Sequence, residues 1–231
     1  MTVRIGVVTF PGSLDDRDAQ RAVRSMGAEP VALWHADADL RGVDGVILPG
    51  GFSYGDYLRT GAIASFAPVM TEIAAFARRG GPVLGICNGF QILCEADLLP
   101  GALIRNRGLS FICRWLNVRV ENGASGLRAG EVLGVPIKHG EGQFVASPEE
   151  IERIEADGLV ALRYCSPIGE VKDDFNYNGS TDGIAGVWNE GRNVLGLMPH
   201  PEHAVDADLG ATGGRVILQW LIAAATQSAA A

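Results

Sequence analysis

The first half of the chain alternates apolar runs with segments whose apolar residues recur at helical spacing. Residues 3–10 form an apolar run, and Ala19, Ala22, Val23 and Met26 then recur as on one face of a helix. The pattern predicts strands over 3–10, 30–34, 45–48 and 82–86, and helices over 15–26 and 68–79. Buried strands linked by helices favour a parallel sheet covered on both faces.

The pattern changes in the second half of the chain. From Trp115 to Glu121 polar and apolar residues alternate, which indicates a half-buried strand and antiparallel pairing. Ser147 with Glu150 forms a capping box, and Pro148 suits the first helical position, so a helix should run to about Ala156. The remaining elements predicted are a hairpin over 184–197 and a helix over 214–225, with the alanine-rich residues after Gln227 fraying.

These elements together predict the fold class. We expect an α/β fold of the doubly wound type, with a mostly parallel sheet, helices on both faces and a small antiparallel extension. The length of 231 residues and the 47% of hydrophobic residues suit one globular domain over residues 1–231.

Charge and composition exclude several classes of function. The net charge is −8 and there is no basic block, so we expect no nucleic-acid partner. No apolar run approaches the ~18 residues that cross a bilayer, and no signal-peptide pattern follows the first run, so we expect a soluble, cytoplasmic protein without a membrane partner. The four cysteines lack the spacing of a zinc site, and no metal site is expected.

The segment Gly85-Ile86-Cys87-Asn88-Gly89 follows a predicted buried strand and leads into a helical pattern. This G-x-C-x-G spacing is typical of a nucleophile elbow, in which a sharp strand-to-helix turn exposes the central side chain between two small residues. The start of the helix would favour the thiolate of Cys87. The alternative is that Cys87 packs as a small apolar residue.

A thiolate nucleophile needs an imidazole that accepts and returns a proton. His200 follows the apolar run 194–197, and Glu202 lies two residues on, which in an extended segment places both side chains on one side. Glu202 would then hold one ring nitrogen of His200 while the other faces Cys87. His203 has no matching partner in the sequence, and we expect it on the rim of the site.

The glycine pair Gly50-Gly51 ends the third predicted strand, next to the elbow in a parallel sheet. The N–H of Gly50 or Gly51, with the N–H of Asn88, would form an oxyanion hole. Because glycine peptides rotate at little steric cost, we expect these donors not to be fixed in the free protein. The alternative is an ordinary glycine turn.

Four segments together carry a resemblance to a known family: 48–56 (LPGGFSYGD), 85–91 (GICNGFQ), 139–142 (HGEG) and 198–202 (MPHPE). The chain resembles the class I (triad) glutamine amidotransferases from Phe10 to Glu202. The combination of the SYGD, HGEG and MPHPE motifs is similar to the glutaminase subunits that serve purine biosynthesis. The chain departs from their pattern after Ser13, where Leu14-Asp15 stands in place of an Asn-Cys pair.

The resemblance implies a function and a set of roles. Cys87, His200 and Glu202 would hydrolyse glutamine through a glutamyl thioester, and Gln91, with the backbone around Gly140 and Glu141, would hold the glutamine. The ammonia would pass to a large ATP-dependent synthetase subunit that converts formylglycinamide ribonucleotide to formylglycinamidine ribonucleotide. A small bridging subunit would complete the assembly.

The sequence also bears on cofactors and on alternative functions. It has no P-loop lysine motif, so no cofactor is expected in this chain, and ATP and Mg are expected on the synthetase subunit. Two alternatives remain open: a Cys-His hydrolase of another substrate, and a non-catalytic regulatory domain on the same fold.

Overall fold

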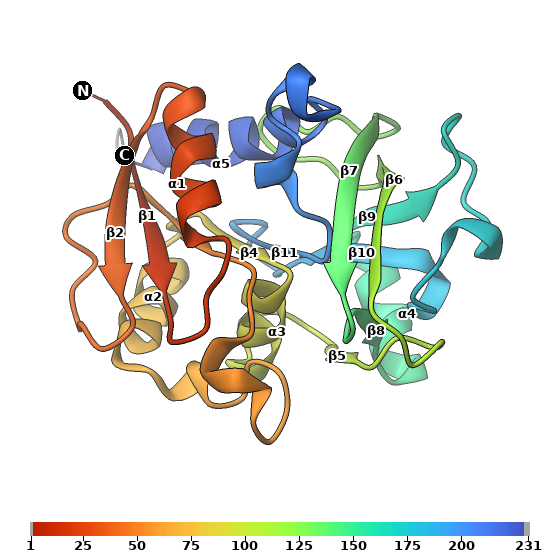
Figure 1. The fold of residues 1–231 in the computed structure, drawn as a ribbon, viewed down its shortest axis with the longest axis horizontal. Coiled ribbons are helices and arrows are strands. Elements are labelled where there is room, and N and C mark those ends of the chain that lie inside the picture. Colours follow the sequence, from red (N-terminus) through yellow and green to blue (C-terminus); the bar gives the residue numbers. More distant parts are fainter. Residues whose placement is uncertain (1, 229–231) are drawn as a thin grey trace.

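A mixed nine-stranded sheet forms the centre of the computed structural model, which describes residues 2–228 (Figure 1). The strand order is β2-β1-β3-β4-β11-β10-β9-β6-β7. The strands of this sheet are β1 (Arg4–Thr9), β2 (Glu29–Trp34), β3 (Gly45–Leu48), β4 (Val83–Ile86), β6 (Ile112–Val120), β7 (Val132–His139), β9 (Val160–Cys165), β10 (Ile184–Trp188) and β11 (Val194–Leu197). A two-stranded antiparallel sheet pairs β5 (Ala102–Ile104) with β8 (Gln143–Val145).

Helices cover both faces of the parallel part of the sheet. Helices α1 and α5 lie on one face and α2 and α3 on the other, while α4 lies beside the antiparallel part (Figure 1). Their bounds are α1 (Asp16–Ser25), α2 (Pro68–Arg78), α3 (Asn88–Glu95), α4 (Pro148–Ala156) and α5 (Gly214–Ser228). Among residues 2–228, none of the helices has both the length and the apolar character needed to cross a membrane.

The sheet changes from parallel to antiparallel at β11. Strands β2, β1, β3, β4 and β11 pair in parallel, whereas β11 and β10 form the predicted hairpin and β9, β6 and β7 continue antiparallel. The predicted fold class is therefore confirmed. The parallel pair β4 and β11 matters most for function, because the segments that follow these two strands carry Cys87 and His200.

The residues that precede α4 and α1 differ in whether their side chains cap the helix. The hydroxyl of Ser147 accepts a hydrogen bond from Glu150 N at 3.2 Å, so the predicted cap of α4 is confirmed. Asp15 occupies the equivalent position before α1, yet its side chain makes no capping hydrogen bond. Its carboxylate is used elsewhere. Helix α5 extends through Ser228, and the part of the predicted fraying tail at 229–231 lies outside the described residues.

Candidate active site

Cys87 sits on a strained turn between β4 and α3. Its φ of 52° and ψ of −105° are unusual for a residue with a side chain, as expected of a nucleophile elbow. The flanking glycines are required by space: a Cβ on Gly89 would lie 2.0 Å from the carbonyl oxygen of Leu48, and one on Gly85 would lie 2.8 Å from Gly89. The G-x-C-x-G segment is therefore an elbow, as its spacing predicts.

His200 and Glu202 follow the neighbouring strand β11 and form a hydrogen-bonded pair. Nδ1 of His200 lies 2.6 Å from Oε1 of Glu202, and both side chains are almost completely buried. The backbone N–H of His200 donates to the carbonyl of Pro136 at 2.8 Å, which fixes the segment against β7. Among the described residues Nε2 of His200 has no hydrogen-bond partner, and the ring lines the same cavity as Cys87.

The electrostatics of this pair favour a charged imidazole. Burial opposes the charged form, but the carboxylate of Glu202 and the sulfur of Cys87 outweigh it and raise the pKa of His200 to about 10. The structure thus brings the three predicted catalytic residues together in a cysteine-histidine-carboxylate arrangement.

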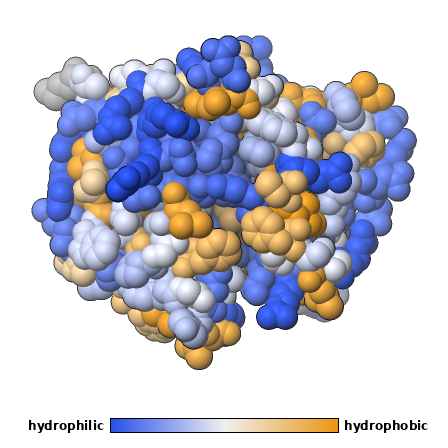
Figure 2. All heavy atoms as spheres, in the orientation of Figure 1, coloured by the Kyte–Doolittle hydropathy of each residue, from blue (hydrophilic) through white to orange (hydrophobic). Residues whose placement is uncertain are grey.

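A cavity of about 240 Å³ opens beside Cys87. The predicted residues Gly51, Gln91, Gly140 and Glu141 line it together with Cys87 and His200. Leu14, Phe52 and Phe111 also line the cavity and are exposed at its mouth. Figure 2 shows apolar groups gathered near the middle of this face among polar ones.

Of the two predicted oxyanion donors, Gly51 lines the cavity, whereas Gly50 packs against Asp15 and His200. The carbonyl of Gly50 accepts hydrogen bonds from Leu14 N at 3.1 Å and Asp15 N at 3.2 Å. Because a trans peptide directs its N–H opposite to its C=O, the N–H of Gly51 points away from residues 14 and 15. Gly50 is held between Asp15 and His200, where an added Cβ would lie 2.4 Å from Oδ2 of Asp15. The oxyanion hole formed by Gly50 or Gly51 with Asn88 stays a prediction.

Gln91 lines the cavity, and the buried side chain of Asn88 is hydrogen-bonded to it. The side chain of Asn88 accepts from Ser53 N at 3.1 Å and donates to Oε1 of Gln91 at 2.9 Å. Gln91 in turn donates through Nε2 to the carbonyl of Glu141 at 2.5 Å. The amide of Gln91 thus connects the elbow helix to the segment Gly140-Glu141, the other predicted wall of the glutamine pocket.

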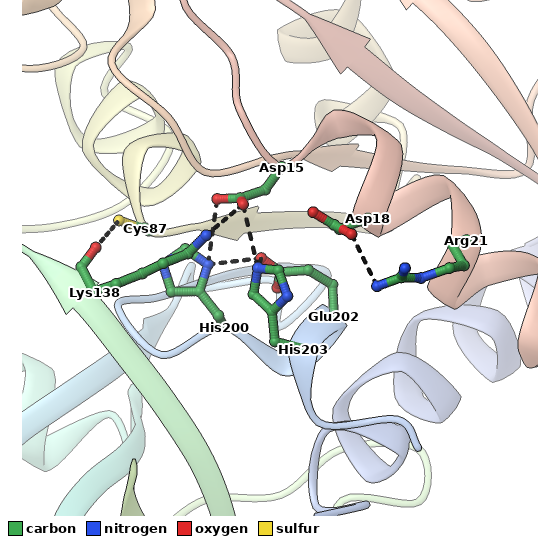
Figure 3. A network of polar contacts seen from close by, with 8 residues as sticks. All are labelled: Asp15, Asp18, Arg21, Cys87, Lys138, His200, Glu202 and His203. Carbon is green, nitrogen blue, oxygen red and sulfur yellow. Dashed lines mark hydrogen bonds and ion pairs between the residues drawn. The ribbon is translucent and has the colours of Figure 1, made fainter. Parts of the chain in front are cut away.

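A second polar group behind His200 was not predicted from the sequence. Oδ1 of Asp15 accepts from Nζ of Lys138 at 2.5 Å and lies 3.2 Å from Nε2 of His203 (Figure 3). The expectation that His203 lacks a partner is wrong, since its Nε2 also lies 3.6 Å from Oε1 of Glu202. Asp15 and Lys138 are 123 positions apart, so no local pattern relates them.

Asp56 is another residue of the cavity that the sequence did not single out as part of the site. Tyr54, Gly55 and Asp56 have consecutive φ values of 53°, 71° and 54°, a left-handed turn that is costly for residues with side chains. Oδ1 of Asp56 is buried without a hydrogen-bond partner among the described residues. Burial and the nearby charge of Glu141 raise the pKa of Asp56 to about 6.

Among the described residues, the side chains of Asp15, His200, Glu202 and His203 bring potential metal-ligand atoms within 4.8 Å of one another. Several of these atoms are already engaged, because Nδ1 of His200 bonds Oε1 of Glu202 and Oδ1 of Asp15 bonds Lys138. The ammonium group of Lys138 also repels a cation. These residues fit a hydrogen-bonded network better than a metal centre.

The comparison with protein families defines the class. The family described as CobB/CobQ-like glutamine amidotransferase domain matches residues 2–211. The elbow cysteine, the histidine-glutamate pair and the adjoining cavity are the parts that such a triad enzyme needs. Fold and site thus define a glutamine amidotransferase of the triad class.

Individual relatives narrow this class. The chain is 59% identical to phosphoribosylformylglycinamidine synthase subunit PurQ of Rubrobacter xylanophilus, over 96% of this chain and 99% of that protein. It is 59% identical to the PurQ subunit of Mycolicibacterium paratuberculosis, over 91% of this chain and 92% of that protein. The solved structure of PurLQS from Thermotoga maritima matches with a TM-score of 0.84 and 44% identity, covering 96% of this chain and 98% of that one. The chain belongs to the family of PurQ subunits of phosphoribosylformylglycinamidine synthase.

Proposed function

We propose that Cys87 hydrolyses glutamine, and that the chain is the glutaminase subunit that supplies ammonia for the synthesis of formylglycinamidine ribonucleotide in purine biosynthesis. The observation that carries the assignment is the elbow cysteine, which shares a cavity with a buried histidine whose Nδ1 lies 2.6 Å from a glutamate. Membership of the PurQ family supports the identity of the product.

The first half of the reaction forms a thioester. The thiolate of Cys87 attacks the side-chain amide carbon of glutamine, and the carbonyl oxygen becomes an oxyanion that the N–H groups of Gly51 and Asn88 stabilise. His200 then gives its Nε2 proton to the amide nitrogen, the carbon–nitrogen bond breaks, and ammonia leaves. Glu202 keeps Nδ1 of His200 protonated throughout.

The second half restores the enzyme. Neutral His200 accepts a proton from water, the resulting hydroxide attacks the thioester, and the carbon–sulfur bond breaks to release glutamate. The departing thiolate and the imidazolium of His200 reform the starting ion pair. These steps use only side chains and backbone of this chain, so we propose that the subunit needs no cofactor of its own and that ATP and Mg act on the synthetase subunit.

Two carboxylates in the cavity fit the α-ammonium group of glutamine. Asp56 and Glu141 both line the cavity with Cys87, and Oδ1 of Asp56 has no hydrogen-bond partner among the described residues. A carboxylate whose charge is disfavoured by burial gains most from an incoming cation. We therefore assign the binding of the ammonium group to Asp56, with Glu141 contributing charge.

The chain works in an assembly. The ammonia goes to the large ATP-dependent synthetase subunit, and a small bridging subunit completes the complex, in line with the PurLQS neighbour. We propose that residues 1–231 act as one glutaminase domain in the cytoplasm, where de novo purine synthesis takes place.

Replacement of Cys87 by alanine tests the function. In the assembled complex, Cys87→Ala should lower glutamine-dependent synthesis by roughly 10⁴-fold or more, while synthesis from ammonium salts continues. Cys94→Ala is the matched control, because Cys94 is a buried thiol on α3, the helix that follows Cys87, and lies outside the cavity. Equal loss of both activities in an intact complex would refute the assignment. Release of ammonia from a substrate other than glutamine would favour a different hydrolase.

A further inference from the structure

A second carboxylate faces the catalytic histidine. Oδ2 of Asp15 lies 3.6 Å from Nδ1 of His200, the same nitrogen that bonds Glu202 at 2.6 Å (Figure 3). Only 4% of the Asp15 side chain is exposed. Two buried carboxylates thus converge on one ring nitrogen, although a triad needs only one.

The position of Asp15 is fixed from several sides. Its Oδ1 accepts from Lys138 at 2.5 Å and contacts Nε2 of His203 at 3.2 Å, and its backbone N–H donates to the carbonyl of Gly50 at 3.2 Å. A Cβ on Gly50 would lie 2.4 Å from Oδ2 of Asp15 and 2.7 Å from Cε1 of His200. The carboxylate and the imidazole therefore pack together over Gly50.

The carboxylate is also ionised. Burial opposes its charge, but the hydrogen bond from His203 and the charges of His200 and Lys138 outweigh burial and hold the pKa of Asp15 well below its usual range. His139 adds no charge at neutral pH, because burial, with the charge of His200, lowers its pKa to about 3. Titratable groups from several elements face the His200 ring. Glu202 and His203 lie on the same segment as His200. The others are Cys87 before α3, Asp15 before α1, and Lys138 and His139 on β7.

We propose that Asp15 is a second positioning carboxylate for His200, which acts with Glu202 to favour the charged imidazole, and that Lys138 limits its effect. The proposal rests on the glutaminase function proposed above, in which His200 moves the proton. At 3.6 Å the carboxylate of Asp15 acts through its charge while Glu202 holds Nδ1. When the charge of Glu202 is removed, Asp15 is close enough to take over part of its role.

Two substitutions of the same ion pair test the electrostatic part. Asp15→Asn removes a negative charge beside His200, so the pH at which the imidazolium loses its proton should fall by roughly one unit. Lys138→Met removes a positive charge and should raise it. A merely structural role predicts the same direction for both, since both break the Asp15–Lys138 pair.

The pH midpoint of the His200 titration is measured by NMR of the histidine-labelled full-length chain carrying Cys87→Ala. This background removes the charge of the sulfur and brings the midpoint of His200 to a more accessible pH. Asp18→Asn is the matched control, because Asp18 lies on α1 but pairs with Arg21 at 2.9 Å, away from the ring (Figure 3). The measurement does not depend on glutaminase activity, so it tests Asp15 even where the Cys87→Ala activity test refutes the proposed function.

A double-variant cycle tests whether the two carboxylates share a role. In the assembled complex with intact Cys87, glutamine-dependent kcat/KM is compared for Asp15→Asn, Glu202→Gln and the double variant. We expect the double variant to lose roughly tenfold more than the product of the single losses, since each carboxylate partly covers for the other.

The proposal is supported by opposite NMR shifts together with the excess loss in the double variant. Shifts in the same direction, no shift for Asp15→Asn, or losses that simply multiply would each overturn it. Should Lys138→Met fail to fold, the Asp15→Asn shift and the double-variant cycle decide.

Discussion

Asp56 offers a test in which binding and stability change in opposite directions. Its carboxylate lies in the left-handed turn 54–56, half-buried, with Oδ1 unpaired among the described residues. No cation in the described part of the chain pairs with this carboxylate, and Glu141 adds a like charge. Replacing Asp56 with asparagine keeps the shape and removes the charge.

The stability effect follows from the raised pKa. A rise from 3.8 to about 6 would cost about 3 kcal/mol in a fully buried site, at about 1.36 kcal/mol per pH unit. Because the group is half-exposed, solvent screening reduces this to about 1 kcal/mol. The folded pKa lies above the unfolded one, so the cost is absent below about pH 4, grows up to about pH 6 and is full above it. Asp56→Asn should therefore raise Tm by about 2–4 °C at pH 8 and not at pH 4.

The binding effect has the opposite sign. An ammonium group about 4 Å from a carboxylate gains about 4 kcal/mol at an effective dielectric constant of 20, and desolvation leaves about 1–2 kcal/mol. Asp56→Asn should raise KM for glutamine by roughly 10- to 30-fold with little change in kcat. In the parent chain KM should increase as the pH falls below about 6, because Asp56 then becomes protonated. The variant should lack this increase.

Steady-state release of ammonia is compared for glutamine and for glutaramate, which lacks the α-amino group. Asp56→Asn should raise KM for glutamine and leave KM for glutaramate unchanged. Asp97→Asn is the control, since Asp97 also has a positive φ, 54°, but is exposed and outside the cavity. A parallel loss with both substrates, or a variant less stable than the parent at pH 8, would show that Asp56 shapes the loop and does not bind the ammonium group.

Two further predictions concern Gly50 and His200. Gly50→Ala should lower glutaminase activity by roughly 10²-fold or more, because the new Cβ would lie 2.7 Å from Cε1 of His200. Gly108→Ala is the control and should be tolerated, since the nearest atom to its Cβ would lie at 3.5 Å; normal activity of Gly50→Ala would contradict the packing argument. His200→Ala should abolish glutamine use, spare ammonia use and slow the alkylation of Cys87 at pH 7; an unchanged alkylation rate would show that the two groups do not interact.

Elements with strong local signals were predictable from the sequence. Strand β3 has the predicted bounds, and α4 begins at the predicted Ser147 cap. Strand β7 was missed, because Gly134 and Pro136 interrupt its apolar pattern. Proline is tolerated there because β7 is an edge strand that pairs only with β6 in the described sheet. Strand β9 was not predicted either, because its apolar run fits a strand or a buried helix equally well.

The proximity of Cys87 and His200 was predictable, because both residues follow the ends of neighbouring strands. Cys87 directly follows β4, and His200 lies three residues after the end of β11; because these strands pair in parallel, topology brings the two residues together. Asp15 and His203 were not predictable in the same way, because they are 188 positions apart and meet only through the packing of the folded chain. Asp56 was missed as part of the pocket because its orientation depends on backbone angles that the sequence does not specify.

The turn Gly50-Gly51 is held by hydrogen bonds, although we expected its peptides to rotate freely. Rotating the Gly50–Gly51 peptide would break the two hydrogen bonds that Leu14 N and Asp15 N donate to Gly50, at a net cost of about 1 kcal/mol each. The next residue is held as well, since Phe52 N donates to the carbonyl of Gly12 at 2.9 Å. The exposed residues Tyr57 and Leu58 lie beyond this anchored part and directly follow Asp56. We therefore expect a partner that contacts them to change substrate binding through Asp56, whereas moving the predicted oxyanion donors would require the partner to break the hydrogen bonds of Gly50.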